Sequence, residues 1–200
     1  MTGTKMRPIT KTIPLEEALT LATAAAVPLD RTERIDLDES VGRVLATAVV
    51  ADQDVPPFNR AAMDGYAVVA DTTFGASRTN PRCLECVETV HTGGLPSKTL
   101  EPGQCTQIAT GAPMPAGADA VVMVEETDRR DGDEVAIFTQ VHPRQHVGRR
   151  GADITDGTEL LRPGDLLTPS RVGSIAALGI AEIDVYVRPS VALISTGNEI

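Results

Sequence analysis

Apolar residues recur at helical spacing in two parts of this chain. In residues 15–26 an apolar side chain returns every three or four positions after a proline and an acidic first turn, which predicts a helix that ends before Pro28. The second part begins with Thr168, a good N-cap residue, and Pro169 follows at the first helical position. Gly179 stands after the last apolar repeat, as glycine does at many helix C-termini. We therefore expect two amphipathic helices, one in each outer part of the sequence.

Elsewhere the pattern is one of short apolar runs separated by glycine and proline, which is typical of strands. The central runs are Tyr66–Val69, Leu84–Val90, Ala120–Glu125 and Val135–Thr139. The outer parts add short strands at Ile35–Leu37, Thr47–Ala51, Leu160–Leu161, Leu166–Leu167 and Ile183–Val187, with a brief helix at Val41–Leu45. Strands of this length and spacing predict a small barrel or sandwich in the central part of the chain.

A last apolar run, Val191–Ile194, has no polar alternation and is typical of a parallel strand buried on both faces. Parallel neighbours require a crossover connection and further strands. The sequence stops at Ile200 before any such element. We therefore expect this chain to be the first half of a longer protein.

The net charge of the chain limits the kinds of molecule that it can bind. The chain has 18 basic and 28 acidic residues, so its net charge is −10 and its pI is about 4.7. A protein of this sign does not bind nucleic acid by bulk attraction, and no apolar run is long enough to span a membrane. Because the N-terminus also lacks the apolar core of a signal peptide, the sequence predicts a cytoplasmic protein.

Cysteine and histidine spacing gives no strong metal motif. Cys83 and Cys86 have the spacing of half a zinc site, but no second pair follows, so we expect a free pair in a loop or edge strand. His142 and His146 flank Pro143, which prevents the regular helix that would bring them to one face. We expect both histidines to be loop residues.

The most informative segment is Pro57-Phe58-Asn59-Arg60-Ala61-Ala62-Met63-Asp64-Gly65-Tyr66-Ala67. A rigid proline entry leads to Asp64 beside Gly65, and glycine can adopt positive φ where other residues are strained. Asp-Gly between apolar runs is also the strongest short-range signal for a simple hairpin. From these residues alone, Asp64 is either a supported ligand or an ordinary turn residue.

Two further segments follow in order. One runs from Thr110-Gly111-Ala112-Pro113 to Val122, and the other from Arg149-Arg150-Gly151 through Arg188-Pro189 to Ser195-Thr196-Gly197-Asn198-Glu199. Together with the first segment they resemble the molybdopterin molybdenumtransferase family, the MoeA and gephyrin E-domain group, from about Pro14 onward. The chain departs from the usual family pattern, Asp-Asn-Ser, at Asn59-Arg60-Ala61, and Asn198 stands where the family often has Asp.

The resemblance implies an α+β multidomain fold. A discontinuous linker and dimerisation domain of mixed helix and strand would comprise residues 1–50 and 142–188. A small β-barrel-like domain, residues 51–141, would be inserted into it. Residues 189–200 would form the first strand of a following α/β domain that binds molybdopterin.

The resemblance also implies an activity. Family members join molybdate to the dithiolene of adenylylated molybdopterin and release AMP, assisted by Mg²⁺. Magnesium is usually held by one or two carboxylates together with substrate phosphates and water, so a protein site needs few acidic ligands. We expect the full-length protein to be active and these 200 residues alone to be inactive.

By its match to the family loop, Asp64 is the predicted catalytic carboxylate and magnesium ligand. Thr110 and Gly111 would hold an oxyanion through a hydroxyl and backbone donors, although Thr110 could instead end a short helix over residues 104–109. Arg149 and Arg150 carry guanidinium groups that match phosphate or molybdate geometry, where surface arginines in a solvated turn are the alternative.

Glu199 and the Ser195-Thr196-Gly197 turn would lie beyond the last strand, where open α/β sheets bind ligands. The resemblance makes Glu199 catalytic and the turn residues cofactor-binding, although Glu199 could simply begin a helix. Asp119 is a weaker candidate that could equally cap a turn.

Because Asp64 and Glu199 would lie in different domains, the resemblance implies a homodimer with a shared active site. Molybdopterin adenylyltransferase and molybdoenzymes or their chaperones are the implied protein partners, with no role for nucleic acid or membranes. Two other readings remain open at this point: a non-catalytic dimeric scaffold of the gephyrin type, and an unrelated acidic β module whose Asp-Gly and Thr-Gly loops are only turns.

Overall fold

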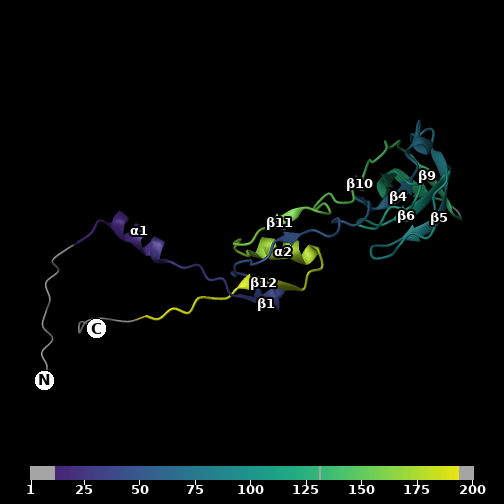
Figure 1. Cartoon of the computed structure of the whole chain (residues 1–200). Coiled ribbons are helices and arrows are strands. Elements are labelled where there is room, and N and C mark those ends of the chain that lie inside the picture. Colours follow the sequence, from purple (N-terminus) through teal and green to yellow (C-terminus); the bar gives the residue numbers. More distant parts are fainter. Residues whose placement is uncertain (1–11, 131, 194–200) are drawn as a thin grey trace, which may run out of the picture.

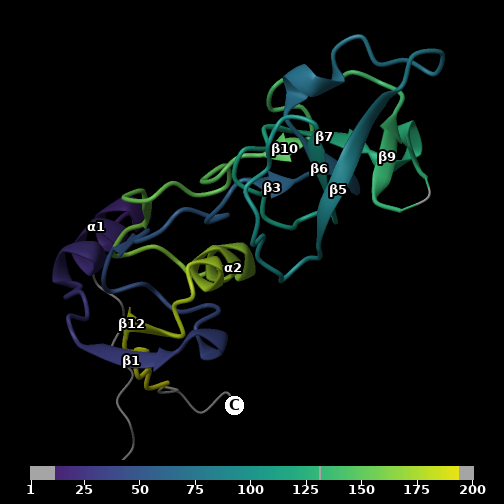
Figure 2. The same cartoon turned by 90° about the vertical axis from the view of Figure 1, so that its right-hand side faces the viewer.

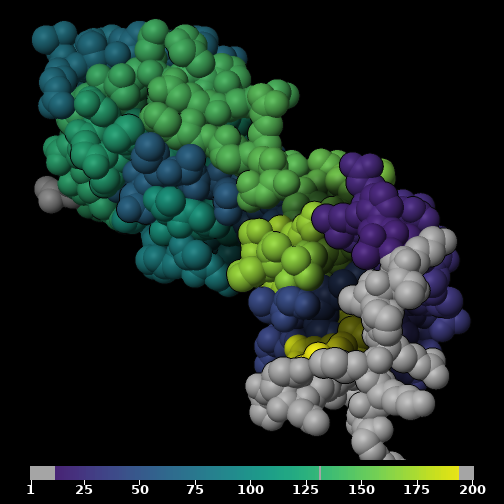
Figure 3. Space-filling view, turned by 90° about the vertical axis from the view of Figure 1, so that its left-hand side faces the viewer, coloured from purple at the N-terminus to yellow at the C-terminus, as the bar shows by residue number. Residues whose placement is uncertain are grey.

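The computed structural model describes residues 12–130 and 132–193. These residues form two lobes joined by a narrow connection (Figures 1 and 3). We call residues 60–148, which contain a six-stranded sheet, the sheet lobe. The outer segments, which contain the helices, form the helix lobe. No helix among the described residues has both the length and the apolar character needed to cross a membrane.

The helix lobe is built from short elements of both outer segments. They are β1 (Thr32–Asp36), the 3-10 turn Leu37–Glu39, β2 (Val49–Val50), β11 (Glu159–Leu161), α2 (Pro169–Ala177) and β12 (Glu182–Tyr186), and α1 (Leu15–Ala25) precedes them and lies apart from their core in Figure 1. Strands β1 and β12 pair antiparallel, as do β2 and β11. The core contains Leu37, Leu45, Val49, Ala51, Leu161, Leu167, Ile175, Leu178, Ile183 and Val185. Each strand pair joins residues more than 100 positions apart, so the two outer segments fold as one unit.

Both predicted helices are present. The side chain of Thr168 accepts a hydrogen bond from the backbone N–H of Arg171 and so caps α2, and Pro169 occupies its first turn. Gly179 has φ 77°, the left-handed conformation that commonly follows a helix C-terminus. Helix α1 begins after Pro14 and buries none of its residues.

The sheet lobe contains β3 (Arg60–Ala61), β4 (Gly65–Val68), β5 (Arg82–Val90), β6 (Gln104–Ile108), β7 (Ala120–Met123), β8 (Thr127–Arg129), β9 (Glu134–Ile137) and β10 (Val147–Gly148), with 3-10 turns at Ala70–Thr73 and Val124–Glu126. Six strands form one sheet in the order β7-β4-β6-β5-β9-β8. The sheet curls around its core (Figure 2), but β7 and β8 at its two edges do not pair with each other in the described part of the chain. The lobe is therefore an open, curled half-barrel and neither a closed barrel nor a sandwich.

Apolar residues cover both faces of this sheet. One face packs Tyr66, Val68, Leu84, Cys86, Cys105, Val122, Val135 and Ile137. The other packs Ala61, Ala67, Val90, Ile108, Ala112 and Val121. Alternate residues of a strand point to opposite faces, so a strand covered on both sides is apolar throughout, as all four buried residues of β4 are.

Two chain segments connect the lobes and hydrogen-bond to each other. The N–H of Val55 donates to the carbonyl of Ile154 over 2.7 Å, and the N–H of Gly151 donates to that of Pro56 over 2.9 Å. The contacts of residues 142–148 place them in the sheet lobe, because β10 pairs with β3. The division into domains at residues 51–141 stays a prediction, and these contacts favour extending the inserted part to about residue 148.

One alternative and one local prediction were wrong. Residues 104–109 are not the end of a helix, because residues 104–108 form β6, whose backbone bonds to β4 and β5 in the middle of the sheet. Residues 41–45 form a turn and isolated bridges in place of a brief helix, because Gly42 has φ 79° and its N–H donates to the carbonyl of Leu167.

The positions of two other segments also differ from expectation. Cys83 and Cys86 lie in β5, an inner strand between β6 and β9, and Cys86 is buried. Residues 191–193 form no strand, and the side chain of Leu193 is 94% exposed. The remainder of that predicted strand, beginning with Ile194, lies outside the described residues.

Candidate functional site

Asp64 lies at the start of β4, in a bend that is not a hairpin. Strand β3 ends at Ala61 and pairs with β10, whereas β4 pairs with β6 and β7, so the two strands around Asp64 do not pair with each other. The φ of Gly65 lies outside the left-handed region, contrary to expectation. Glycine is needed there for space: a Cβ atom on Gly65 would lie 1.9 Å from the carbonyl oxygen of Val122.

Thr110 holds the Asp64 carboxylate in place. Its backbone N–H donates to Asp64 Oδ1 over 2.7 Å, and its hydroxyl donates to the same oxygen over 2.9 Å. The pairing of β4 with β6 brings them together, because Gly65 lies opposite Ile108. The Thr110 N–H, followed by its hydroxyl, lowers the pKa of Asp64 below its usual value. The carboxylate is therefore ionised at neutral pH, and Oδ2 accepts no hydrogen bond from the described residues.

The segments around Asp64 and Thr110 interlock through their backbones. The N–H of Gly111, at φ 84°, donates to the carbonyl of Ala61 over 2.8 Å, and the N–H of Ala61 donates to the carbonyl of Ala112 over 2.9 Å. On the other side, the hydroxyl of Thr92 donates to the carbonyl of Thr110 over 2.8 Å. The carboxylate and its hydroxyl partner are thus fixed by a rigid scaffold, as a functional site requires.

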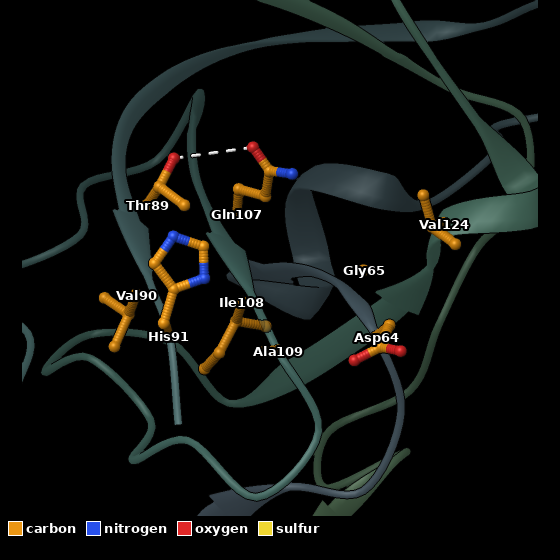
Figure 4. Close-up of a pocket in the computed structure, with 9 residues that line it drawn as sticks. All are labelled: Asp64, Gly65, Thr89, Val90, His91, Gln107, Ile108, Ala109 and Val124. Atoms are coloured by element: carbon orange, nitrogen blue, oxygen red, sulfur yellow. Dashed lines mark hydrogen bonds between the residues drawn. The ribbon is translucent and has the colours of Figure 1, made fainter. Parts of the chain in front are cut away.

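A pocket of about 200 Å³ opens beside Asp64. Its wall contains Asp64, Gly65, Thr89, Val90, His91, Gln107, Ile108, Ala109 and Val124. In Figure 4 the His91 ring and the Asp64 carboxylate lie on opposite sides of Ile108 and Ala109. His91 and Gln107 could not be predicted as pocket residues from the sequence, because only the pairing of β5 with β6 brings their separate segments together.

The residues beside Asp64 could hold magnesium only together with ligands that a substrate and water supply. Within residues 12–130 and 132–193, no group of three or more His, Cys, Asp or Glu side chains could hold a metal ion. Magnesium sites of enzymes that act on phosphates often use one or two carboxylates and take their remaining ligands from phosphate and water. Asp64 Oδ2 could serve as such a carboxylate oxygen, with the other ligands supplied by substrate.

Arg150 and Arg149 differ in what they contact. Arg150 Nε donates to Asp54 Oδ2 over 2.5 Å, and the other Asp54 oxygen accepts from the N–H of Asp156 over 3.0 Å. That N–H, followed by the Arg150 side chain, lowers the pKa of Asp54. Gly151, at φ 68°, leaves room for the contact, since its Cβ would lie 2.8 Å from Asp54 Oδ1. Arg150 therefore braces the connection between the lobes, and both Arg149 and Arg150 line a pocket separate from that of Asp64.

The other candidate residues are placed as follows. Asp119 Oδ1 accepts from the N–H of Ala70 over 2.7 Å, so this carboxylate caps a turn. His142 and His146 are loop residues, and His146 Nδ1 lies 3.1 Å from the carbonyl oxygen of Val121. Ser195, Thr196, Gly197 and Glu199 lie outside the described residues, so their predicted roles stay predictions.

Comparison with known proteins identifies the family. Residues 13–179 match the family described as the MoeA N-terminal region, domains I and II. This chain belongs to that family, as its three sequence motifs indicate.

Several relatives are named molybdopterin molybdenumtransferase. Molybdopterin molybdenumtransferase 2 of Mycobacterium tuberculosis is 44% identical over 166 residues, which cover 83% of this chain and 41% of that protein. The molybdopterin molybdenumtransferase of a Nostoc species is 40% identical over 169 residues, covering 84% of this chain and 38% of that protein. The crystal structure of the molybdopterin biosynthesis MoeA protein from Pyrococcus horikoshii OT3 superposes with a TM-score of 0.82 and 39% identity, covering 90% of this chain and 47% of that one. This chain thus spans less than half the length of the relatives that it matches.

Proposed function

We propose that this chain is the N-terminal part of an enzyme that inserts molybdate into adenylylated molybdopterin and releases AMP with the help of Mg²⁺. The observation that carries the proposal is the contact between Thr110 and Asp64, in which two donors fix one carboxylate oxygen at the wall of a pocket. A plain hairpin would need neither this contact nor the interlocked loops behind it.

Asp64, Thr110 and Gly111 have different roles in this reaction. Asp64 stays ionised and offers Oδ2 as a ligand, while Thr110 prevents the carboxylate from turning away. A magnesium ion bound there would offset negative charge on the phosphoryl oxygens of the substrate. The N–H groups of Thr110 and Gly111 already donate to Asp64 and to the carbonyl of Ala61, so we assign oxyanion binding to Arg149 and give Gly111 a positioning role.

We further propose that the protein acts as a homodimer with an active site shared between subunits. Support comes from α1, whose leucines are exposed in the single chain: Leu15 is 74% exposed and Leu19 is 57% exposed. An apolar helix surface of this kind is typical of a protein interface. The same surface supports the second candidate function, a dimeric scaffold without turnover.

An assay of AMP release distinguishes the enzyme from the non-catalytic scaffold. A protein of the relatives' length that carries these residues is incubated with adenylylated molybdopterin, molybdate and Mg²⁺, and AMP is measured by chromatography. We expect AMP to form only when both molybdate and Mg²⁺ are present. A dimer that releases no AMP under these conditions would support the scaffold and contradict the enzyme.

A further inference from the structure

A second pocket, of about 250 Å³, lies beside the pair of strands β3 and β10. It is lined by Asn59, Arg144, Val147, Arg149 and Arg150. Three arginines therefore line one cavity, and no acidic residue lines it. All its polar side chains carry N–H donors, and the only acceptor among them is the amide oxygen of Asn59.

Two of these arginines make no ion pair. In the described part of the chain, nine arginines pair with acidic side chains, and Arg150 is one of them through Asp54. Arg144 and Arg149 have no such partner, although the chain has a net charge of −10 and thus a surplus of acids. An acidic protein that leaves two guanidinium groups unneutralised in a pocket favours an anion there.

The backbone at Arg144 is a second and independent observation. Arg144 has φ 70°, a conformation that glycine adopts without strain and that a residue with a Cβ rarely takes. Its N–H donates to the carbonyl of Asp119 over 2.7 Å, which fixes the turn in this form. Strained residues of this kind cluster at functional sites, where their side chains are needed. The turn itself would be easier to form with glycine, so its geometry does not explain the arginine.

Asn59 completes the donor set. Its Oδ1 accepts from the N–H of Arg150 over 2.9 Å, and its carbonyl accepts from the N–H of Met114 over 2.9 Å. This bond fixes the orientation of the amide, and its Nδ2 group, which is a donor, has no hydrogen-bond partner among the described residues. The site therefore offers two guanidinium forks and an amide N–H₂, which suit a tetrahedral oxyanion.

We propose that Arg144, Arg149 and Asn59 form a binding site for a tetrahedral oxyanion, separate from the Asp64 pocket. The identity of the anion rests on the proposed function. That reaction offers two candidate anions, a phosphoryl group of the nucleotide-linked pterin and molybdate. Binding of the anion does not depend on whether the protein is catalytically active.

The test is calorimetric titration of this chain at low salt with inorganic phosphate, AMP and molybdate in separate arms. Arg144→Gly and Arg149→Gln are compared with Arg31→Gln, which removes the same charge from an exposed arginine outside the pocket. We expect each pocket variant to weaken binding at least tenfold and Arg31→Gln to leave it within twofold. We also expect Arg144→Gly to raise the thermal unfolding midpoint, because it relieves the left-handed backbone, so weaker binding would not reflect misfolding.

The three arms identify the source. Binding of phosphate and AMP without molybdate assigns the site to a phosphoryl group, and binding of molybdate alone assigns it to the metal oxyanion. No binding by any probe, or an equal loss in Arg31→Gln, would overturn the proposal. Asp64→Asn is expected to leave this binding unchanged, so a failure of the proposed activity would be seen separately in the AMP assay.

Discussion

At the scale of the residue, Thr110 decides what Asp64 can do. Its two hydrogen bonds keep the carboxylate ionised and hold one oxygen fixed while the other remains available. The family resemblance predicted both residues as site members, and the structure shows that they touch. His91 and Arg144 could not be predicted in the same way, because the first reaches its pocket through strand pairing and the second through an unusual backbone conformation.

Replacing Thr110 by valine tests this positioning role. Valine keeps the shape and the backbone N–H but removes the hydroxyl, so we expect turnover to fall roughly 10- to 100-fold, the effect of losing a partner that orients a metal ligand. Thr110→Ser restores the hydroxyl and should recover most of the rate. AMP release by the two variants gives the comparison, and equal rates would show that the hydroxyl has no such role.

Asp54 gives a prediction about pH. Because its pKa is lowered in the folded chain, its contacts stabilise the fold fully above the ordinary value of 3.8, and the contribution is lost as pH falls through the lowered pKa. Asp54→Asn cannot take up this proton. Urea unfolding should therefore show the variant less stable than the wild type at neutral pH, with a difference that narrows on acidification. A difference that stays constant down to the lowest pH would contradict this assignment.

At the scale of the element, the two amphipathic helices and the four central apolar runs were predicted, whereas the brief helix at residues 41–45 and strand β6 were not predicted correctly. Helix α2 is specified locally by Thr168, Pro169 and Gly179, which act within a few residues. Strand β6 was misread because its conformation depends on β4 and β5, which lie far away in sequence. Gly65 was recognised as special for the wrong reason: it is required by the approach of β7 and not by its φ angle.

Two glycine substitutions separate these effects. Gly65→Ala places a methyl group against the backbone of β7, so we expect it to destabilise the fold by about 3 kcal/mol, at the upper end for overpacking. Gly173→Ala lies within α2 with no atom within 4 Å of the new methyl, so helix propensity should stabilise the fold by about 0.5–1 kcal/mol. Chemical denaturation measures both. A harmless Gly65→Ala would show that the approach of β7 is not a constraint.

At the scale of the whole molecule, the two lobes carry different tasks. The sheet lobe holds Asp64 and its pocket, the arginine pocket lies where the sheet lobe meets the connecting segments, and helix α1 in the N-terminal outer segment is unburied. The sequence predicted an α+β chain with an inserted β part, but it could not show that the sheet curls without closing, because closure depends on whether β7 meets β8.

The exposed surface of α1 predicts self-association. Leu19 is more than half exposed in the single chain, so Leu19→Glu should weaken the dimer while leaving the unfolding of the dilute chain unchanged. Light scattering over a range of micromolar concentrations gives the dimer affinity. A wild-type protein that stays monomeric throughout would remove the shared site from the account.

The central claim is that Asp64 is a charged ligand held for a divalent cation, and its most direct test is the rate of AMP release by Asp64→Asn over a range of Mg²⁺ concentrations. Asparagine can accept the Thr110 hydrogen bonds but carries no charge, so we expect the rate to fall about 100- to 1,000-fold, the scale of losing one electrostatic contact at the reacting centre. The control Asp128→Asn, an exposed acid of β8, should be unaffected. Full activity of Asp64→Asn, with an unchanged dependence on Mg²⁺, would contradict the account.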